Sequence, residues 1–387
     1  MEFNQVVEGL PPYPMEELNR IKRGLVEGGA KIFDFGTGDP RIPTWEPIKE
    51  AVRDAIPAVS QYPTIRGGDG LRDGIWSYLE GRFGLCREES GLDILTSNGS
   101  KEAVFHTALC VVGSGGRRRV LYPDPGYPVY KSGTLFAGGI PTPMELLAGE
   151  SYLMKPWLLP SERQKETCAI WVNYPHNPTG AIASDSYYKE LLAWSKEQGV
   201  FVLSDECYVD IYDEKKEPPL SLSTYGSENV FSFMSLSKRS GITGYRSGFI
   251  IGPKKLIAKL ARARANFGVG TPVSIQAGAK VAWQDEGHVA KRRRLFTERI
   301  DYMVPKLKAL GLLEKEPSAS FYLWCKIPDK WSLDDIAFSL ALAQKGVITT
   351  PSSWLSEGVK GYIRFAMAPD ISELPEAIKI IESFLSS

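Results

Sequence analysis

One stretch of the sequence, residues 231–248, concentrates side chains that could do chemistry. It reads F-S-F-M-S-L-S-K-R-S-G-I-T-G-Y-R-S-G. An apolar run with strand propensity leads to Ser235, Ser237 and Lys238, and a turn with two glycines then leads to Arg246. Two hydroxyls and a guanidinium beside one lysine suit a phosphate site that has a primary amine within reach. On its own, a lysine near serines is usually a solvated loop residue.

A lysine amine can also act as a covalent catalyst by condensing with a carbonyl, as it does in enzymes that use pyridoxal phosphate (PLP). This interpretation predicts three further parts: an acid beside the pyridine nitrogen, donors for the ring oxygen, and an aromatic side chain on which the ring stacks. Residues of these types follow successive apolar strands elsewhere in the sequence. Ligands of open α/β sheets bind beyond the carboxyl ends of the strands, so we expect one shared site there.

Candidates for all three parts can be named. Asp205 ends the run V-F-V-L-S-D, where a carboxylate needs a polar partner to offset its desolvation. Tyr208 and Asn177 could donate to a phenolate oxygen, which would keep a conjugated imine in its reactive form. Tyr127 could stack on the ring. Each residue alone is equally compatible with a cap, a turn or a core position, and only their joint order on strand ends favours one site.

The overall composition is that of an ordinary globular protein. The chain has 387 residues, 43% of them hydrophobic, which suits two domains or one large α/β domain with an appendage. Lys plus Arg equals Asp plus Glu at 46 each, so no net field favours nucleic acid or an anionic membrane. Two short basic runs, residues 117–119 and 291–294, are interpreted as a solvated turn and a solvated helix face rather than as a nucleic-acid patch.

The cysteine pattern and the N-terminus favour a cytoplasmic location. The five cysteines are scattered without C-x-x-C spacing, which argues against a zinc site or a disulfide framework, so no metal site is predicted. The N-terminus lacks a basic region followed by an apolar stretch, and no run of 18 apolar residues occurs. We therefore expect neither export nor membrane insertion.

The order of elements predicts an α/β fold with a mostly parallel sheet. Apolar strand-like runs alternate with amphipathic helical runs as far as about residue 285. The expected strands are 92–96, 120–122, 169–173, 200–204, 230–234 and 249–251. The expected helices are 45–56, 70–83, one ending at 112, one after D-P-G-Y-P-V-Y, 185–198 and one from 254 onward. Repeated βα units of this kind imply a parallel sheet that helices cover on both faces.

Beyond about residue 285 the pattern changes to α+β. The expected elements there are a long charged helix at 288–310, a strand at 321–326, a helix at 333–344, short strands at 347–350 and 362–366, and a final helix at 371–384. Met15, Leu18, Ile21 and Leu25 also predict a helix near the N-terminus, which we expect to pack with this part. The predicted division is an arm and helix at 1–40, which belongs to the small domain, a large domain at 41–285, and a small C-terminal domain at 286–387.

From about Gly36 to about Arg364 the chain resembles the fold-type-I, PLP-dependent aminotransferases of class I/II. The lysine motif of that family, small-x-small-Lys with Arg eight residues later, matches Ser235 to Arg246. The resemblance implies a large domain with a mostly parallel sheet between helices, a smaller α+β domain, and PLP bound as an imine on Lys238. The implied phosphate contacts are Gly99, Ser100, Lys101, Ser235, Ser237 and Arg246. The implied ring contacts are Asp205 at the pyridine nitrogen, Asn177 and Tyr208 at the ring oxygen, and Tyr127 on the ring face.

The resemblance also implies substrate contacts and a homodimer. Arg364, in Y-I-R-F-A, matches the family's arginine that binds the substrate α-carboxylate, and Gly38 matches a glycine that contacts the same carboxylate through its backbone. Tyr62 matches a tyrosine that reaches the phosphate of the neighbouring subunit. The implied partners are an amino acid, a 2-oxo acid and a second copy of the chain. His176 and Ser247 depart from the common pattern, which bears on the subfamily rather than on the reaction.

Within the family, the segments D-E-C-Y-x-D-I-Y and R-A-N-F-G-V-G resemble the N-succinyl-diaminopimelate aminotransferases of bacterial lysine biosynthesis. This implies N-succinyl-L,L-diaminopimelate as donor and 2-oxoglutarate as acceptor, with Arg20, Arg23 and Arg66 as candidate cations for the acidic far end. Two alternatives stay open: an aminotransferase of other specificity (aspartate, alanine, aromatic or L,L-diaminopimelate), and a PLP-dependent β-lyase or decarboxylase. A nucleotide-binding enzyme is disfavoured because the sequence has neither G-x-x-x-x-G-K-[ST] nor G-x-G-x-x-G.

Overall fold

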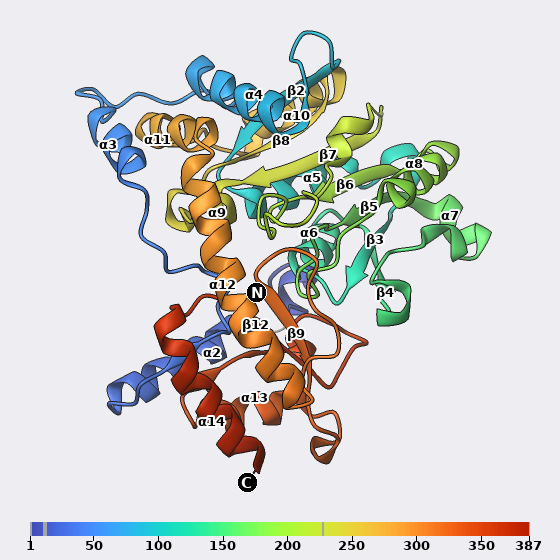
Figure 1. The fold of residues 1–387 in the computed structure, drawn as a ribbon. Helices are drawn as coiled ribbons and strands as arrows, with labels where there is room; N and C mark the ends of the chain where they lie inside the picture. Colours follow the sequence, from blue (N-terminus) through green and yellow to red (C-terminus); the bar gives the residue numbers. More distant parts are fainter. Residues whose placement is uncertain (1, 11–13, 227, 387) are drawn as a thin grey trace.

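A computed structural model describes residues 2–10, 14–226 and 228–386 and shows two unequal parts (Figure 1). The larger part is built on a seven-stranded sheet, and the smaller part, below it in Figure 1, contains a three-stranded and a two-stranded sheet. The long helix α12 (Gly287–Ala309) runs from the larger part down into the smaller one. The α/β fold predicted from the sequence is confirmed, whereas the domain boundaries at 40 and 285 stay a prediction.

The large sheet is mostly parallel. Its strands, in spatial order, are β2 (Leu92–Ser97), β8 (Gly248–Pro253), β7 (Val230–Ser235), β6 (Phe201–Asp205), β5 (Thr167–Val172), β3 (Arg119–Asp124) and β4 (Ile140–Glu145). Only β8 pairs antiparallel with its neighbours. The sequence did not predict β4, whose two prolines argue against a central strand. The structure places β4 at the sheet edge, where proline is tolerated.

The antiparallel strand β8 begins where its two neighbours end. Gly248 pairs with Ser235 at the end of β7 and with Ser97 at the end of β2. The turn before β8 therefore holds Arg246 beside the carboxyl ends of both neighbouring strands. The 231–248 stretch thus folds back on itself, and Lys238 and Arg246 both lie in the connection between the end of β7 and the start of β8.

Helices cover both faces of the large sheet (Figure 1). They are α3 (Glu46–Asp54), α4 (Asp69–Phe83), α5 (Ser100–Val111), α6 (Val129–Phe136), α7 (Ser161–Glu166), α8 (Asp185–Gln198), α9 (Leu236–Arg239), α10 (Lys254–Phe267) and α11 (Val273–Gln284). Alternate strand residues pack into different clusters: Trp171 joins the one containing α5 and α10, whereas Ile170 joins the one containing α8. Both faces are apolar, so these strands read as nearly continuous hydrophobic runs.

The smaller part combines residues from both ends of the chain. Its antiparallel sheet has the order β11 (Thr350–Pro351), β12 (Tyr362–Ala366), β9 (Tyr322–Lys326), and its parallel pair is β1 (Phe33–Asp34) with β10 (Val347–Ile348). Its other helices are α2 (Pro14–Glu27), α13 (Asp335–Ala343) and α14 (Leu374–Ser386), and a short helix α1 (Gln5–Glu8) lies near the N-terminus. Leu18 of α2 packs against Ala343 and Ile348, as expected for the N-terminal helix.

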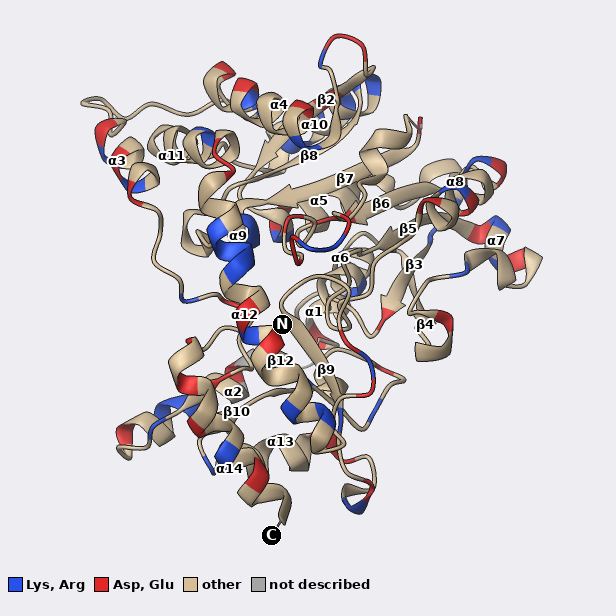
Figure 2. Cartoon of the chain, viewed as in Figure 1, with Lys and Arg blue, Asp and Glu red and all other residues tan. Residues whose placement is uncertain are grey.

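Charged side chains of both signs are spread over the chain, but Lys and Arg gather on α12 near α9 (Figure 2). The interpretation of residues 291–294 as a solvated helix face is wrong for two of the four residues. Arg292 and Arg293 are 4% and 5% exposed. Arg293 binds Glu214 and Glu286, while Arg292 donates to backbone carbonyls. The reason is that α12 runs between the two parts, so one of its faces is enclosed.

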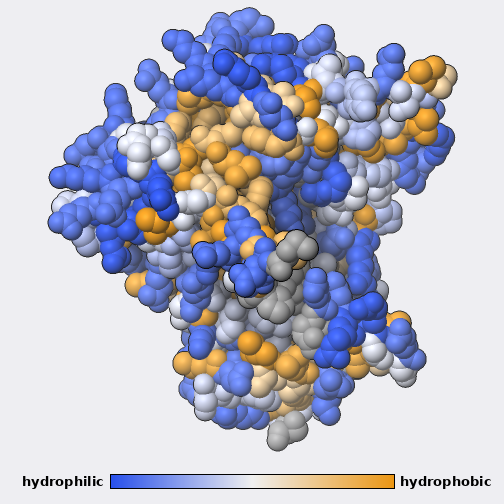
Figure 3. Space-filling model, turned by 180° about the vertical axis from the view of Figure 1, so that it is seen from behind, coloured by the Kyte–Doolittle hydropathy of each residue, from blue (hydrophilic) through white to orange (hydrophobic). Residues whose placement is uncertain are grey.

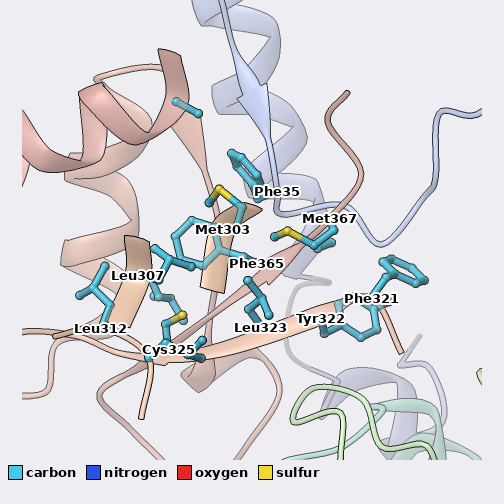
Figure 4. Close-up of a cluster of buried hydrophobic side chains, with 14 of the residues drawn as sticks. Phe35, Met303, Leu307, Leu312, Phe321, Tyr322, Leu323, Cys325, Phe365 and Met367 are labelled. Carbon is cyan, nitrogen blue, oxygen red and sulfur yellow. The ribbon is translucent and has the colours of Figure 1, made fainter. Parts of the chain in front are cut away.

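The surface is mixed, and apolar side chains gather on the face turned away in Figure 1 (Figure 3). Within the described ranges, no helix is both long enough and apolar enough to span a bilayer. The core of the smaller part is continuous across its sheets (Figure 4). Phe35 packs edge-on against Phe365 at 5.3 Å, and Phe321 stacks on Phe296 of α12 at 4.9 Å. This core fixes the strands that face the larger part.

Candidate active site

A cavity of about 520 Å³ opens at the carboxyl ends of the strands of the large sheet and is closed on the other side by the smaller part. The sequence-predicted residues that line it are Gly38, Ser100, Lys101, Tyr127, Asn177, Asp205, Tyr208, Ser237, Lys238, Arg246 and Arg364. The first and last of these residues, Gly38 and Arg364, are more than three hundred positions apart in the sequence. A cavity of this volume can hold a small organic ligand together with a substrate.

Three predicted residues lie outside this lining. Ser235 is buried, and its Oγ accepts a hydrogen bond from the Ser237 backbone N–H at 3.1 Å, which caps α9. Gly99 directly precedes α5 with a φ of +87°, and an added Cβ there would lie 2.4 Å from Arg246 Nη2. Tyr62 is fully exposed. Ser235 and Gly99 thus support the lining, whereas Tyr62 lies away from the cavity of its own chain.

Lys238 lies on α9, one short turn after β7. Its Nζ donates to the carbonyl oxygen of Gly38 and lies 6.0 Å from the centre of the Phe321 ring. Gly38 comes close because it has no side chain: an added Cβ would lie 2.3 Å from the Tyr322 hydroxyl. The amine therefore points across the cavity from the larger part towards segments of the smaller part.

Asp205 ends β6 and is 5% exposed. Its Oδ2 accepts from the Tyr130 hydroxyl at 2.9 Å, and its Oδ1 accepts from the Cys207 backbone N–H at 3.3 Å. Burial raises the pKa of Asp205, although these hydrogen bonds oppose the shift. A carboxylate in this setting is stabilised by a cation in the cavity, and a protonated pyridine nitrogen would provide one.

Asn177 has its amide oriented by a neighbour from the smaller part. Its Oδ1 accepts from Arg364 Nη1 at 2.9 Å, so its NH₂ group points the other way, 3.5 Å from the Tyr208 hydroxyl. That hydroxyl lies 3.1 Å from the hydroxyl of Tyr322. Burial, followed by the Tyr322 hydroxyl, raises the pKa of Tyr208, which keeps it a proton donor. Asn177 and Tyr208 thus present hydrogen-bond donors to the cavity.

Arg364 lies on β12 and is 6% exposed. Its Nη2 donates to the Gly36 carbonyl oxygen at 2.9 Å, and its guanidinium lies 4.4 Å from the centre of the Tyr322 ring. Its Nε is buried and has no hydrogen-bond partner among the described residues. A buried, incompletely bonded guanidinium is suited to bind a carboxylate.

Several other groups in the lining suit a phosphate. Arg246 has its guanidinium held by the carbonyls of Thr243 at 2.7 Å and Asn98 at 3.2 Å. Ser100 and Lys101 lie at the N-terminus of α5, where unpaired N–H groups and the helix dipole stabilise an anion. Ser237 also lines the cavity and can donate through its hydroxyl.

Sequence reasoning missed several lining residues: Tyr130, Asn173, Cys207, Tyr322, Thr350 and Trp354. Tyr130 had a signal, because it follows Tyr127 by three residues and so lies close to it at the start of α6. Asn173 had a signal in the sequence too, because it directly follows β5. In the structure its Oδ1 accepts from the Asn177 N–H at 2.9 Å, and its Nδ2 donates to the Asp205 carbonyl at 2.7 Å. Tyr322 had none, because only the packing of the two parts brings β9 to the cavity.

These residues fit PLP by the chemistry that they present. The cavity has a buried carboxylate for the ring nitrogen, two donors for the ring oxygen, cations and a helix N-terminus for the phosphate, and a lysine amine. No group of three or more His, Cys, Asp or Glu side chains that could hold a metal ion occurs in the part of the chain that the structure describes.

Residues 30–381 match the family model of the class I and II aminotransferases. The chain belongs to this family. The LL-diaminopimelate aminotransferase of Aquifex aeolicus is 34% identical over 386 residues, which cover 99% of each protein. The structure of substrate-bound BacF from Bacillus subtilis has a TM-score of 0.90 at 26% identity and covers 99% of this chain and 98% of that one. That of a probable N-succinyldiaminopimelate aminotransferase from Thermus thermophilus has a TM-score of 0.85 at 27% identity, covering 96% and 99%.

The sequence-based assignment to this PLP-dependent family is therefore confirmed, and the protein is an aminotransferase. The finer expectation, a specific likeness to the N-succinyl-diaminopimelate enzymes, finds one structural neighbour of that name, while the curated relative at 34% identity is named for LL-diaminopimelate.

Proposed function

We propose that this aminotransferase binds PLP through Lys238 and transfers an amino group from an amino acid to a 2-oxo acid. The observation that carries the proposal is the meeting of Lys238, Asp205 and Arg364 around one cavity. Bound PLP supplies a conjugated ring that stabilises negative charge at the substrate Cα. The residues of the chain then orient the substrate and move its protons.

Each side chain has a task that its surroundings support. The Asp205 carboxylate holds a proton on the ring nitrogen, because its burial makes a nearby cation favourable. Asn177 and Tyr208 donate to the ring oxygen, and Tyr127 lies against the ring. Ser237, Arg246 and the start of α5 bind the phosphate, with Ser235 and Gly99 supporting these residues.

Lys238 then acts as the base. With PLP bound, its Nζ would hold the cofactor covalently until a substrate amine displaced it, and the freed amine would then be placed to accept the Cα proton of the substrate and to donate it again. Arg364 pairs with the α-carboxylate and so holds the Cα–H bond near this amine. Gly38, whose carbonyl lies beside Nζ, sets the near edge of the substrate position.

We infer that the amino donor is L,L-diaminopimelate, with 2-oxoglutarate as the acceptor. The name of the relative with 34% identity supports this donor, and so does the exposed carboxylate of Asp39 in the cavity lining, which could pair with a distal ammonium. N-succinyl-L,L-diaminopimelate is the second candidate, supported by the name of the Thermus thermophilus structure. The cations predicted for an acidic far end, Arg20, Arg23 and Arg66, are not among the lining residues, and Arg66 pairs with Asp93 at 2.5 Å.

We further propose a cytoplasmic homodimer in which Tyr62 reaches the phosphate of the partner. An exposed tyrosine away from its own cavity is consistent with this role. An apolar groove of about 690 Å³, lined in part by Phe105, Leu135 and Phe136, adjoins Lys101 and Arg246 and suits a subunit contact. All five cysteines are unpaired, which fits a reducing compartment.

The donor test compares kcat/KM for L,L-diaminopimelate, its N-succinyl derivative, aspartate, alanine and phenylalanine, with 2-oxo acid products identified. A preference for L,L-diaminopimelate of at least about tenfold, equivalent to 1.4 kcal/mol, is expected. Equal values for all donors would overturn the donor assignment alone. Pyruvate with ammonia, or carbon dioxide, as the main product would instead indicate a β-lyase or a decarboxylase.

The dimer test mixes two inactive or impaired proteins, Tyr62→Phe and Lys238→Ala. If sites are shared, hybrid dimers contain one site with both native residues, so the mixture should exceed the summed activity of its components. A fully active monomer in solution would contradict the shared site.

A further inference from the structure

A buried chain of hydrogen bonds joins the turn that carries Lys238 to the start of α12. Ser240, two residues after Lys238, has its Oγ 2.8 Å from His288 Nε2. The other ring nitrogen of His288, Nδ1, lies 2.7 Å from Asp285 Oδ1. Ser240 and His288 are buried. The order is therefore hydroxyl, imidazole, carboxylate, with the hydroxyl on the lysine turn.

The protonation states along this chain follow from its surroundings. Partial burial opposes ionisation of Asp285, but hydrogen bonds from His288 lower its pKa, so it accepts the Nδ1 proton. Burial lowers the pKa of His288 to about 4; Arg239 and Arg292 lower it too, against the opposing effect of Asp285. His288 is thus neutral at physiological pH. Its Nε2 carries no proton and accepts a hydrogen bond from the Ser240 hydroxyl.

The same three residue types form nucleophilic triads in hydrolases, but their place here argues against that role. A nucleophilic serine must reach the reacting carbonyl of a substrate. Ser240 is 2% exposed, and neither Ser240 nor His288 is among the residues lining the Lys238 cavity. The Ser240–His288–Asp285 hydrogen bonds therefore hold the turn that carries Lys238 and do not act on a substrate.

Further contacts from the same helix hold the same turn. Arg292 Nε donates to the Arg239 carbonyl at 3.1 Å, and its Nη2 approaches the Lys238 carbonyl at 3.4 Å. Arg239 binds Asp210 at 3.0 Å and Glu286 at 3.0 Å. The Trp45 ring stacks on the His288 ring at 5.1 Å, nearly parallel at 2°. The three residues from Lys238 to Ser240 are therefore all bonded to the region around the start of α12.

We propose that His288, oriented by Asp285, is a positioning residue that fixes the Lys238 turn through Ser240 and so aims the amine at the reacting atoms. This rests on the proposed role of Lys238. The lysine side chain has four rotatable bonds, so its reach depends on a rigid backbone at its root. Small misplacements of a catalytic group lower the rate strongly without removing the group.

The test dissects the imidazole with two amides in PLP-loaded protein. His288→Gln places an amide oxygen near the Nε2 position and can still accept from Ser240, whereas His288→Asn replaces only the Nδ1 side. Ser240→Ala removes the hydroxyl itself. The matched control is Ser195→Ala on α8, which deletes another buried hydroxyl, one that donates to the Val200 carbonyl oxygen at 3.0 Å. Each protein is measured for the pH titration of the PLP–lysine absorption band, for kcat and KM, and for thermal stability.

We expect Ser240→Ala and His288→Asn to shift the absorption titration and to lower kcat by roughly 10- to 100-fold, with KM for the donor within about twofold. His288→Gln should stay close to wild type in both measurements. Ser195→Ala should lose stability only. Unchanged titration and kcat in Ser240→Ala and His288→Asn, even with reduced stability, would overturn the proposal. If the wild-type protein has no such absorption band, the proposed PLP function itself fails, which separates the two results.

Discussion

The two walls of the cavity are built in different ways. On one side, Asp205 ends β6, while Asn177 and Lys238 follow β5 and β7, its parallel neighbours in the large sheet. Backbone hydrogen bonds between these strands fix their spacing. On the other side, Tyr322 and Arg364 lie within the antiparallel strands β9 and β12 of the smaller part and reach the cavity across the junction of the two parts.

This difference assigns different tasks to the walls. The sheet wall holds charged and polar groups at the ends of rigid strands, which suits a cofactor whose position must not vary. The wall from the smaller part carries the carboxylate-binding Arg364, and its position depends on how the two parts pack. Substitutions in the sheet wall should therefore lower mainly the rates of the chemical steps. Substitutions in the other wall should mainly weaken substrate binding.

The largest expected effect is that of Lys238→Ala. Without the amine, neither the covalent link to PLP nor proton transfer at Cα is possible, so turnover should be abolished while PLP still binds noncovalently. Activity and the absorption band of the purified protein check this. Lys254→Ala, at an exposed position at the start of α10, is the control and should remain active. Wild-type turnover in Lys238→Ala would falsify the role of this lysine.

The next effect is that of Asp205→Asn. An amide cannot stabilise a protonated ring nitrogen, so the rate of Cα–H loss in a single turnover should fall more than 100-fold, or about 3 kcal/mol. Donor affinity should change little, because Arg364 is intact. A near-normal single-turnover rate would show that the carboxylate does not serve the ring.

In the cofactor-free protein, Asp205→Asn should stabilise the fold, although it slows the reaction of the PLP-bound enzyme. The pKa of Asp205 is raised by burial, so its ionised form opposes folding at pH values above the folded-state pKa, and this penalty disappears as the pH falls below the unfolded value. Asp205→Asn should therefore raise the melting temperature of cofactor-free protein at pH 7 to 8 and change it little at pH 4. Equal melting shifts at both pH values would contradict the burial argument.

The sequence predicted the sheet wall better than the other wall, for a physical reason. Asp205 ends one apolar run and Asn177 comes soon after another, and the carboxyl ends of parallel strands meet at one edge, so their convergence follows from local patterns. Tyr322 lies in an ordinary strand pattern, and its approach to Gly38 depends on tertiary packing alone. Arg364 was identified by family resemblance rather than by its local pattern.

Two of the sequence-based predictions were wrong, and each error has a physical cause. Strand β4 was missed because proline lowers the strand signal, although an edge position tolerates it. Buried Arg292 was assigned to a solvated face because charge runs usually are solvated, and only the enclosed course of α12 explains its burial. His288 gave no signal either, since its partners, apart from Asp285, are distant in sequence.

A smaller effect is expected for Arg364→Ala, which tests the substrate wall. The lost bidentate pair should raise the transition-state free energy by about 2 kcal/mol and so lower kcat/KM for every amino donor alike, mainly through KM. Arg364→Lys should recover only part of this, because an ammonium cannot form the paired contact. A loss confined to one donor would show that Arg364 binds the far end of that donor instead of the α-carboxylate.

The smallest effect is expected at one of the contacts between the two walls, the hydroxyls of Tyr208 and Tyr322, which lie 3.1 Å apart. Each substitution, Tyr208→Phe and Tyr322→Phe, removes the same contact, so their effects on kcat/KM should overlap. We expect a coupling energy of about 1 kcal/mol in a double-mutant cycle. Tyr174→Phe is the control: its hydroxyl bonds the Tyr152 carbonyl at 2.9 Å within the larger part, and its loss should lower stability without changing the rate. Additive effects of the two substitutions on kcat/KM would mean that the walls act independently at this contact. A coupling energy near the expected value would instead show that the contact between the two hydroxyls helps to align the wall from the smaller part with the sheet wall.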